Sequence, residues 1–249
     1  MSDADKSQDR PSPLLTKGNK RLDEIGAFKW SIPALSTRID GKTVTTCPAA
    51  GVCASMCYAT QGSFRFSNVL SRHQANLRFV MEDLAGWENA LTTELTAPRY
   101  KDKWVRVHDS GDFFSDDYTE AWLRVMRASP DTGFYAYTKE VSRFKRLVEP
   151  SPPANFLWCY SLGGKEDQLV DRDRDRVADV FPDEDSIAAA GWHSQLGNDL
   201  LSVLGPAPVG MSANNIPRFV KKMRGRRFSE LQAELTERKA ARRTAEQDE

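Results

Sequence analysis

Short apolar runs alternate with amphipathic stretches through the middle of the chain. Residues 104–108 (WVRVH), 134–138 (FYAYT) and 156–161 (FLWCYS) are rich in β-branched and aromatic side chains and end at polar or glycine residues, which predicts three strands. Residues 115–128 and 139–148, which separate them, have the apolar spacing of helices. This alternation predicts consecutive strand–helix units with a parallel sheet.

The same pattern continues on both sides of these units. A long helical pattern runs from about Ser67 to Leu95, and residues 209–212 (VGMS) are expected to form a last strand. Such a sheet can remain open and doubly wound, or it can close into a barrel. Of the two we predict a TIM-barrel-like (β/α) fold. It would be compact or irregular, because complete barrels typically need about 250 residues and the chain without its two ends has fewer.

The two ends of the chain differ from its middle. Residues 1–20 are polar and contain two prolines without any periodicity, which predicts a disordered arm. We expect residues 21–217 to form one (β/α) barrel domain. Residues 218–249 read as a charged helical tail, with 10 Lys and Arg against 6 Asp and Glu. Nucleic acid could contact this tail, but a charged terminal helix usually needs no partner, so this partner is not favoured.

Composition narrows the class of protein. The 249 residues include 35 Lys and Arg and 35 Asp and Glu, so the formal net charge is +0. This balance argues against a surface built wholly to neutralise phosphate and leaves room for a local basic patch. No apolar run approaches the roughly 20 residues that span a bilayer, and the first residues lack the apolar stretch of a secretory signal. We therefore expect a cytoplasmic protein without a membrane partner.

Cysteine is the rare residue type that suggests chemistry. The chain has four cysteines, and three of them, Cys47, Cys53 and Cys57, fall within eleven residues, while Cys159 lies about a hundred residues further on. A reducing compartment discourages disulfides, so metal or redox chemistry becomes the leading question. No dinucleotide fingerprint follows any predicted strand, and no Walker A sequence is present.

The cysteine spacing favours an iron–sulfur cluster over zinc. Structural zinc sites usually pair cysteines in C-x2–4-C knuckles, whereas clusters accept several thiolates from one loop and another from a distance. We predict a [4Fe–4S] cluster held by Cys47, Cys53, Cys57 and Cys159, with zinc as the alternative. Strand alternation places Cys159 on one face with Leu157 and Ser161, directed into a barrel interior. A simpler interpretation is that Cys159 is only a small buried hydrophobic residue and not a ligand.

The motifs resemble a known family. The stretches CPAAGVCASMCYATQGSFRF, VRVHDSGDFFSDDYTEAW, FYAYTKE and FLWCYSLGG, within residues 28–215, are similar to the phage "gene product 88" domain family. The resemblance implies a phage-encoded protein that works in the host cytoplasm. It also implies kinship with radical-SAM-like iron–sulfur barrels, in which a cysteine loop precedes the parallel strands.

The chain departs from the radical SAM pattern. Those enzymes generally use C-x3-C-x2-C, so three thiolates leave one iron open for S-adenosylmethionine, whereas the spacing here is x5 and x3. If Cys159 is a fourth ligand, no iron is free, which suits electron transfer or redox sensing. If Cys159 is not a ligand, radical chemistry becomes available again. The glycine-rich segment that binds the methionine part is not evident.

Five polar residues at predicted strand ends are candidates for the cluster surroundings. His108 could donate to a cluster sulfur or transfer a proton, and Asp112 could orient a ligand. Asp109 and Asp112 serve equally well as turn or helix caps. Lys139 could supply positive charge beside an anionic cluster, and Ser161 could help to bind a small anion.

Three functions follow from these residues. The first is a redox role, in electron transfer or sensing, with a redox partner that the sequence does not identify. The second is a radical SAM-type enzyme with a three-cysteine cluster. The third is a zinc-stabilised module that binds nucleic acid or protein. The sequence leaves open whether the chain is catalytic.

Overall fold

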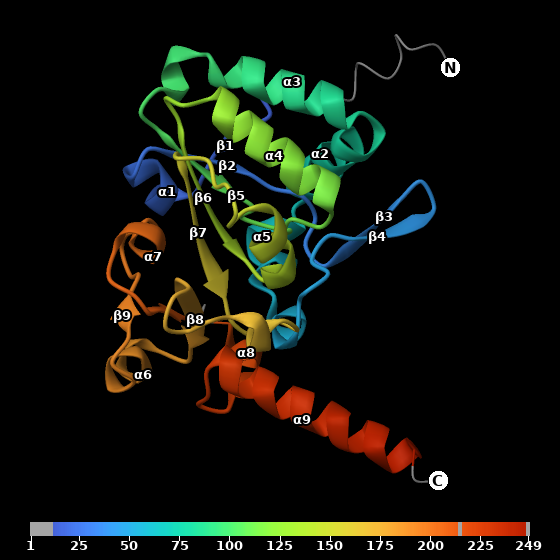
Figure 1. Cartoon of the computed structure of the whole chain (residues 1–249), viewed down its shortest axis with the longest axis vertical. Helices are drawn as coiled ribbons and strands as arrows, with labels where there is room; N and C mark the ends of the chain where they lie inside the picture. The colour runs from blue at the N-terminus through green and yellow to red at the C-terminus, as the bar shows by residue number, and fades with distance from the viewer. Residues whose placement is uncertain (1–11, 214–215, 248–249) are drawn as a thin grey trace.

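The computed structural model describes residues 12–213 and 216–247 and consists of one central sheet with helices on both sides (Figure 1). The strands of the sheet lie in the order β1-β2-β5-β6-β7-β8-β10-β9. Only β1 runs antiparallel to its neighbour, and the other pairs are parallel. The strands are β1 (Thr16–Lys17), β2 (Ala27–Trp30), β5 (Trp104–Val107), β6 (Gly133–Thr138), β7 (Phe156–Ser161), β8 (Val177–Phe181), β9 (His193–Ser194) and β10 (Val209–Ser212).

The helices sort by the face of the sheet that they cover. One face packs against α2 (Ser67–Glu82), α3 (Leu84–Leu95), α4 (Asp116–Ala128) and α5 (Val141–Leu147). The other face carries a smaller apolar cluster with residues of α1 (Lys20–Glu24) and α7 (Leu201–Leu204). The remaining helices are α6 (Glu184–Ala189), α8 (Pro217–Met223) and α9 (Phe228–Gln247). A separate hairpin, β3 (Ser36–Ile39) and β4 (Lys42–Thr45), stands beside α2.

Aromatic side chains fill the larger core. Trp30 of β2 packs against Trp87 of α3 and Trp122 of α4, with ring centroids 5.5 and 6.3 Å away. The Trp30 indole Nε1 donates to the Tyr118 hydroxyl at 2.8 Å, so its one polar atom is paired inside the core. Ser115 caps α4 by accepting from the backbone N–H of Tyr118, as the sequence pattern predicts.

The predicted parallel α/β architecture is confirmed, but the sheet does not close into a barrel within the described residues. Its end strands are β1 and β9, and they do not pair with each other. The physical reason lies at β2, whose outer edge pairs with Thr16 and Lys17 of β1, so it cannot accept a last strand. From β2 to β8 the strands of this sheet lie in chain order, as in a barrel, but β10 lies between β8 and β9, so the open sheet departs from the barrel order at this end.

The predicted N-terminal arm is partly ordered. Residues 1–11 lie outside the described residues, but Leu14 and Leu15 are buried in the larger core. Their backbone N–H groups both donate to the carboxylate of Glu94 on α3. Residues 12–20 therefore belong to the folded body.

The C-terminal helix α9 is attached to the body by its first turns and then projects away from it (Figure 1). Phe228 and Leu231 pack against Met56 and Met223. The backbone N–H of Ser229 donates at 3.2 Å to Asp179, a fully buried carboxyl on β8. This part of the predicted tail is thus integral to the fold.

Because the Asp179 carboxyl is buried, we predict that the stability of the protein depends on pH. Burial raises its pKa to about 6, above the ordinary value of 3.8, so the folded state holds a proton that the unfolded state has lost between these pH values. The free energy of unfolding must therefore fall as pH rises from about 4 to 6. We expect Asp179→Asn to gain stability relative to the parent protein over this interval, by on the order of 2 kcal/mol. Urea unfolding at several pH values measures the difference, and a pH-independent difference would contradict the prediction.

Candidate functional site

A cavity of about 690 Å³ opens at the carboxyl ends of the parallel strands. Its walls include residues in the strands or just after them. These are Lys29 in β2, Asp109 after β5, Lys139 after β6, Ser161 at the end of β7 and Met211 in β10. Ligands of parallel α/β sheets bind at this edge, because the strand ends deliver loops from several elements to one place. The cavity has the size that encloses a small-molecule ligand.

The cysteine loop forms one wall of this cavity. Residues 46–66 contain three short 3-10 turns, η1 (Val52–Met56), η2 (Tyr58–Thr60) and η3 (Gly62–Arg65), which leave many backbone groups without helical partners. Other parts of the chain supply these partners. The Cys53 N–H donates to the Gly163 carbonyl at 3.3 Å, and the Val52 N–H donates to Gln232 of α9 at 2.7 Å.

Small residues make this close approach possible. A Cβ added to Gly51 would lie 2.9 Å from the Gly163 carbonyl oxygen and closer still to the Gln232 side chain. Ala50 pairs with Gly164 in an isolated antiparallel bridge. The loop is therefore packed between the turn that follows β7 and the first turns of α9.

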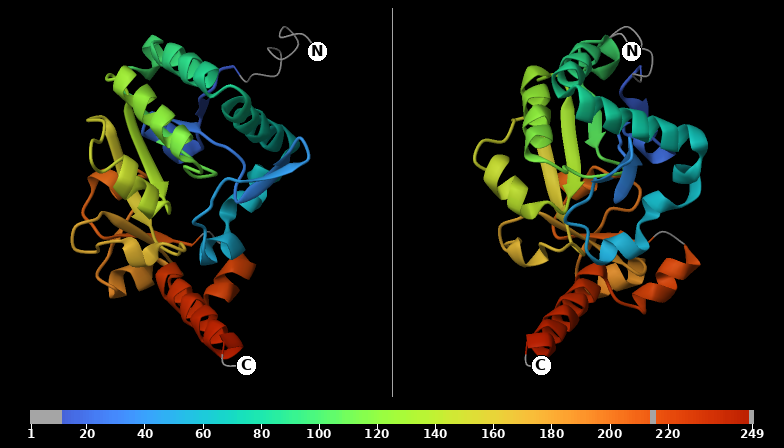
Figure 2. Two further views of the ribbon diagram at one scale, coloured as in Figure 1. Left: turned by 45° about the vertical axis from the view of Figure 1, so that its right-hand side comes forward. Right: turned by 90° about the vertical axis from the view of Figure 1, so that its right-hand side faces the viewer.

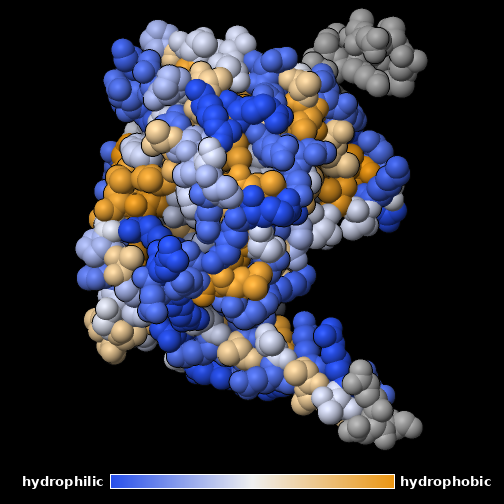
Figure 3. Space-filling view, in the orientation of Figure 1, coloured by the Kyte–Doolittle hydropathy of each residue, from blue (hydrophilic) through white to orange (hydrophobic). Residues whose placement is uncertain are grey.

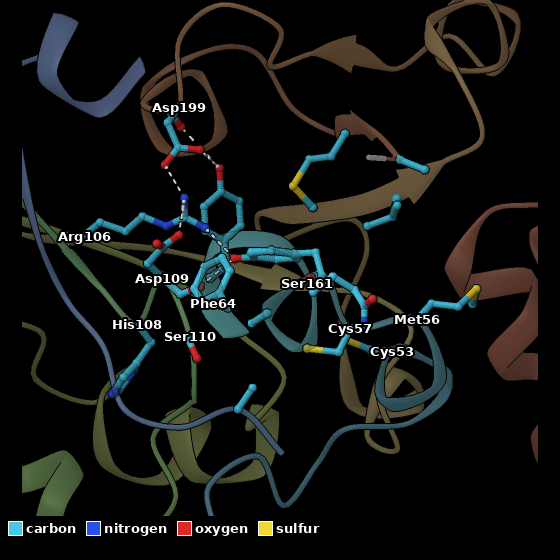
Figure 4. Close-up of a pocket in the computed structure, with 18 of the residues that line it drawn as sticks. Cys53, Met56, Cys57, Phe64, Arg106, His108, Asp109, Ser110, Ser161 and Asp199 are labelled. Carbon is cyan, nitrogen blue, oxygen red and sulfur yellow. Dashed lines mark hydrogen bonds and ion pairs between the residues drawn. The ribbon is translucent and has the colours of Figure 1, made fainter. Parts of the chain in front are cut away.

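Three thiols from this loop, those of Cys47, Cys53 and Cys57, line the cavity. Burial, and then the nearby Cys53 thiol, raise the pKa of Cys57 to about 11, while N–H groups of Ala59 and Thr60 act in the opposite direction. Burial also raises the pKa of Cys47 far above its ordinary value, although the Leu35 N–H donates to its sulfur at 3.3 Å. At neutral pH both are thus protonated thiols in the metal-free protein. Figure 4 shows Cys53 and Cys57 at one end of the cavity.

Cys159 lies elsewhere. It is completely buried in the smaller apolar cluster with Leu22, Tyr135 and Val209, and it is not among the described residues that line the cavity. Strand alternation predicted its face correctly, since Leu157 packs against the same cluster. Burial raises the pKa of Cys159 to about 12. Among residues 12–213 and 216–247, no group of three or more His, Cys, Asp and Glu side chains is arranged to hold a metal ion.

Asp112 holds the cysteine loop to the sheet. Its carboxylate accepts from the Thr138 hydroxyl at 2.7 Å and from the backbone N–H of Lys139 at 3.0 Å, at the end of β6. Its own N–H donates to the carbonyl of Thr46, next to Cys47. Burial raises the pKa of Asp112 despite these hydrogen bonds. Asp112 therefore joins the end of β6, through its side chain, to the cysteine loop, through its backbone N–H.

Glu140 acts on the loop from the same side. Its carboxylate accepts from the Ala49 N–H at 2.7 Å and pairs with Arg143 of α5. Burial, and then the proximity of Asp112, raise the pKa of Glu140 to about 7. Sequence reasoning had not selected Glu140, because nothing in its local pattern distinguishes it from a helix-capping carboxylate.

Lys139 and Ser161 meet at the cavity wall. The Lys139 ammonium donates to the Ser161 hydroxyl at 2.7 Å and to the carbonyls of Ser161 and Leu162 at 2.6 and 2.9 Å. No carboxylate among the described residues forms an ion pair with Lys139. Its charge favours the thiolate form of Cys57. The sequence-based expectation of positive charge near the cysteines is consistent with this geometry.

His108 points away from the thiols. Its backbone has φ of 66°, a left-handed conformation that turns the side chain into the aromatic core. There its Nε2 lies 2.9 Å from the Tyr118 hydroxyl, and its ring meets Phe113 edge-on. Burial lowers the pKa of His108 to about 3, so the imidazole is neutral at physiological pH. These contacts make His108 a packing residue beneath the cavity.

Asp109 belongs to a network of charges at the other end of the cavity (Figure 4). It pairs with Lys29 at 2.6 Å and with Arg106 at 3.3 Å, and Arg106 pairs in turn with Asp199 at 3.3 Å. Burial would raise the pKa of Asp109, but Arg106 and Lys29 bring it below its ordinary value. Tyr137 donates to Asp199 at 2.9 Å.

Sequence reasoning missed most of this network. Arg106 is a charged residue in an otherwise apolar strand, and that mismatch was the available signal. Asp199 comes from a loop before α7 with no pattern that indicates a site. Only the fold brings it to the strand ends.

Fold and site together define an α/β protein with a cysteine-lined cavity at the carboxyl edge of a parallel sheet. The family model for Gene product 88 matches residues 13–245, so the chain belongs to this family. This confirms the family resemblance seen in the motifs.

Two curated relatives are phage proteins. The chain is similar to the Gene 88 protein of Mycobacterium phage L5, with 38% identity over 105 residues, which are 38% of this chain and 43% of that protein. The Gene 88 protein of Mycobacterium phage D29 is 37% identical over 105 residues, covering 38% and 42%. The chain thus spans less than half the length of the curated relatives it matches. No solved structure matches it. Within the described residues, no helix is both long and apolar enough to cross a bilayer.

The role of Asp112 can be tested by substitution. Asp112→Ala removes the acceptor for Thr138 and Lys139 and leaves buried donors unpaired, so we expect a loss of on the order of 3 kcal/mol in the free energy of unfolding. Urea unfolding measures this loss. Limited proteolysis should cut residues 46–66 faster in the variant.

The control is Asp173→Ala, which removes an exposed carboxyl that makes no side-chain hydrogen bond in the described structure. We expect this control to change stability by less than about 0.5 kcal/mol. Equal effects of the two substitutions would contradict a positioning role for Asp112.

Proposed function

We propose that this protein is an iron–sulfur enzyme. Its [4Fe–4S] cluster is held by Cys47, Cys53 and Cys57, and the iron without a protein thiolate faces the cavity and binds a small molecule. The observation that carries the proposal is that three cysteines from one loop line a single ligand-sized cavity. The radical SAM resemblance suggests S-adenosylmethionine as that molecule. The phage relatives are consistent with a site of action in the host cytoplasm.

The surroundings of the thiols fit an anionic metal group. N–H groups of Leu35, Ala59 and Thr60 act on the Cys47 and Cys57 sulfurs in the direction that favours thiolates. Hydrogen bonds to cluster sulfurs are a known means of tuning such centres. Lys139 adds a cation whose partners are neutral oxygens. Because the thiols are protonated without metal, cluster binding must displace their protons.

The far end of the cavity suits a polar substrate. Arg106, Asp109 and Asp199 present a rigid set of charges there, and Tyr58 adds a hydroxyl that donates to the Asp109 carbonyl at 2.7 Å. These groups would bind and orient a substrate in the cavity. When bound, the cluster would supply one-electron chemistry, and these residues would hold the substrate beside it.

A second candidate keeps the four-thiolate cluster and an electron-transfer or sensing role. It is favoured by the position of Cys159 on β7, two residues before Ser161, which lines the cavity and contacts Lys139. In this arrangement the β7 strand end would have to bring Cys159 out of its apolar cluster. The burial of Cys159 beside Leu22 and Tyr135 supports the three-thiolate arrangement instead.

Anaerobic purification followed by iron, sulfide and zinc analysis tests the proposal. We expect a brown protein with iron and sulfide in equal amounts, and an electron paramagnetic resonance signal after reduction. Cys47→Ser, Cys53→Ser and Cys57→Ser should each lose most of the iron. A colourless protein that contains zinc and no sulfide would overturn the proposal and support a zinc-stabilised module.

Cys159→Ala is the matched substitution that separates the two candidates. We expect it to keep the iron and sulfide of the parent protein, and we expect S-adenosylmethionine to change the spectrum of the reduced cluster. Loss of the cluster in Cys159→Ala, with no spectral response in the parent, would favour electron transfer or sensing. Circular dichroism confirms that each variant is folded.

A further inference from the structure

Two segments at the mouth of the cavity contain no acidic residue. Residues 46–81 carry three arginines, and residues 200–229 carry six lysines and arginines, with no Asp or Glu in either segment. The chain as a whole has a formal net charge of +0, so these nine cations are a local concentration. The positive charge of the C-terminal tail is also concentrated in one part. Its excess of Lys and Arg over Asp and Glu lies in residues 218–227 and not in α9.

The fold brings parts of the two segments to one opening. Phe64 and Val69 from the first segment and Ile216 and Phe219 from the second line the same cavity. The Lys222 ammonium donates to the Ser55 carbonyl at 3.0 Å, which joins α8 to the cysteine loop. Figure 2 shows α8 directly below this loop. The outline of the molecule is indented between the β3–β4 hairpin and α9 (Figure 3).

Four of the nine cations are exposed and pair with no carboxylate of the described residues. Arg78, Arg224, Arg226 and Arg227 pair with carboxylates, and Arg72 donates to backbone carbonyls of residues 13 and 14. No carboxylate among residues 12–213 and 216–247 pairs with the remaining four, which we call the basic rim. The basic rim consists of Arg65, Arg218, Lys221 and Lys222, all of them exposed.

Aromatic surface accompanies the basic rim. Phe66 follows Arg65 and is 62% exposed, and Tyr58 is 37% exposed although its hydroxyl is hydrogen-bonded inside. Arg218 lies over the ring of Phe219, which is itself buried, with 4.9 Å between the guanidinium carbon and the ring centroid. Cations that neutralise phosphates, beside exposed rings on which bases stack, are the combination that binds single-stranded nucleic acid.

We propose that the basic rim and Phe66 bind single-stranded nucleic acid across the mouth of the cavity. A strand fits better than a duplex because the segments that carry these cations line a concave opening and the rings need unstacked bases. The cavity volume of about 690 Å³ would accept an unstacked nucleotide from such a strand. The surface is built from residues other than the cysteines, so this inference goes beyond the proposed function.

Fluorescence anisotropy with a labelled oligothymidylate of about 20 nucleotides tests the inference. The 249-residue chain should bind it, and the affinity should fall steeply between about 50 and 200 mM salt. The triple variant Arg218→Gln, Lys221→Gln, Lys222→Gln should bind at least about tenfold more weakly, and its salt slope should fall by about 2. Arg65→Gln, in the first of the two segments, should lose affinity severalfold and keep its fold.

The matched control removes three cations from α9, with Lys239→Gln, Arg242→Gln and Arg243→Gln. Its affinity should stay within about twofold of the parent protein. Phe66→Ala should weaken binding about tenfold at unchanged salt slope, because it removes stacking and no charge. Duplex DNA of the same length should bind more weakly than the single strand.

Several results would overturn the inference. The first is no binding of the oligonucleotide at about 50 mM salt. The second is an equal loss of affinity in the rim and α9 triple variants, or no loss in Phe66→Ala. The third is tighter binding of duplex DNA, of polyglutamate or of anionic vesicles than of the single strand. Metal analysis of the same preparation separates this outcome from that of the proposed function. Rim-dependent binding by protein without iron would support the inference and refute the cluster.

Discussion

Docking of the cysteine loop on the strand ends is the constraint on which the site depends. A segment without regular helix or strand leaves backbone N–H and carbonyl groups to be satisfied by other parts of the chain. Here those partners come from Asp112 and Glu140 after the central strands, from Gly163 after β7, and from Gln232 of α9. Because these elements are far apart in sequence, the loop adopts its shape only when the sheet and α9 are both in place.

The electrostatics of the cavity divide it into two ends. At one end, burial keeps the Cys47 and Cys57 thiols protonated, while Lys139 and several N–H groups act in favour of thiolates. At the other end, Lys29 and Arg106 balance Asp109 and Asp199, so those charges are largely satisfied within the protein. The thiol end is therefore where a metal cluster bound through thiolates would be stabilised most, and the opposite end is where a polar ligand would be oriented.

Local patterns predicted the helices and strands well, but they did not predict whether the sheet closes into a barrel. The strands at Trp104–Val107, Gly133–Thr138 and Phe156–Ser161, and the helix capped by Ser115, all follow from side-chain periodicity and capping. The open sheet could not be predicted, because it depends on β1, a two-residue strand within a segment whose polar composition suggested disorder. Pairing of Thr16 and Lys17 with β2 is a long-range choice that no local pattern reports.

The candidate site was also predictable only in part, because local patterns show which residues are present but not which distant segments cover them. The crowding of Cys47, Cys53 and Cys57 is visible in the sequence, and so is the face that Cys159 occupies on β7. The complete burial of Cys159 cannot be predicted from the sequence, because it depends on Leu22 and Val209, which cover it from distant segments. His108 was expected at the site from its position after β5, and its left-handed backbone instead directs it into the core.

A Mössbauer spectrum of protein reconstituted with ⁵⁷Fe and sulfide tests directly whether three loop thiolates hold a cluster with one open iron. We predict a [4Fe–4S] spectrum in which a single iron responds to an added small molecule while the thiolate-bound irons stay unchanged, both in the parent protein and in Cys159→Ala. Failure to incorporate iron, or a spectrum in which every iron is equivalent and none responds, would contradict it.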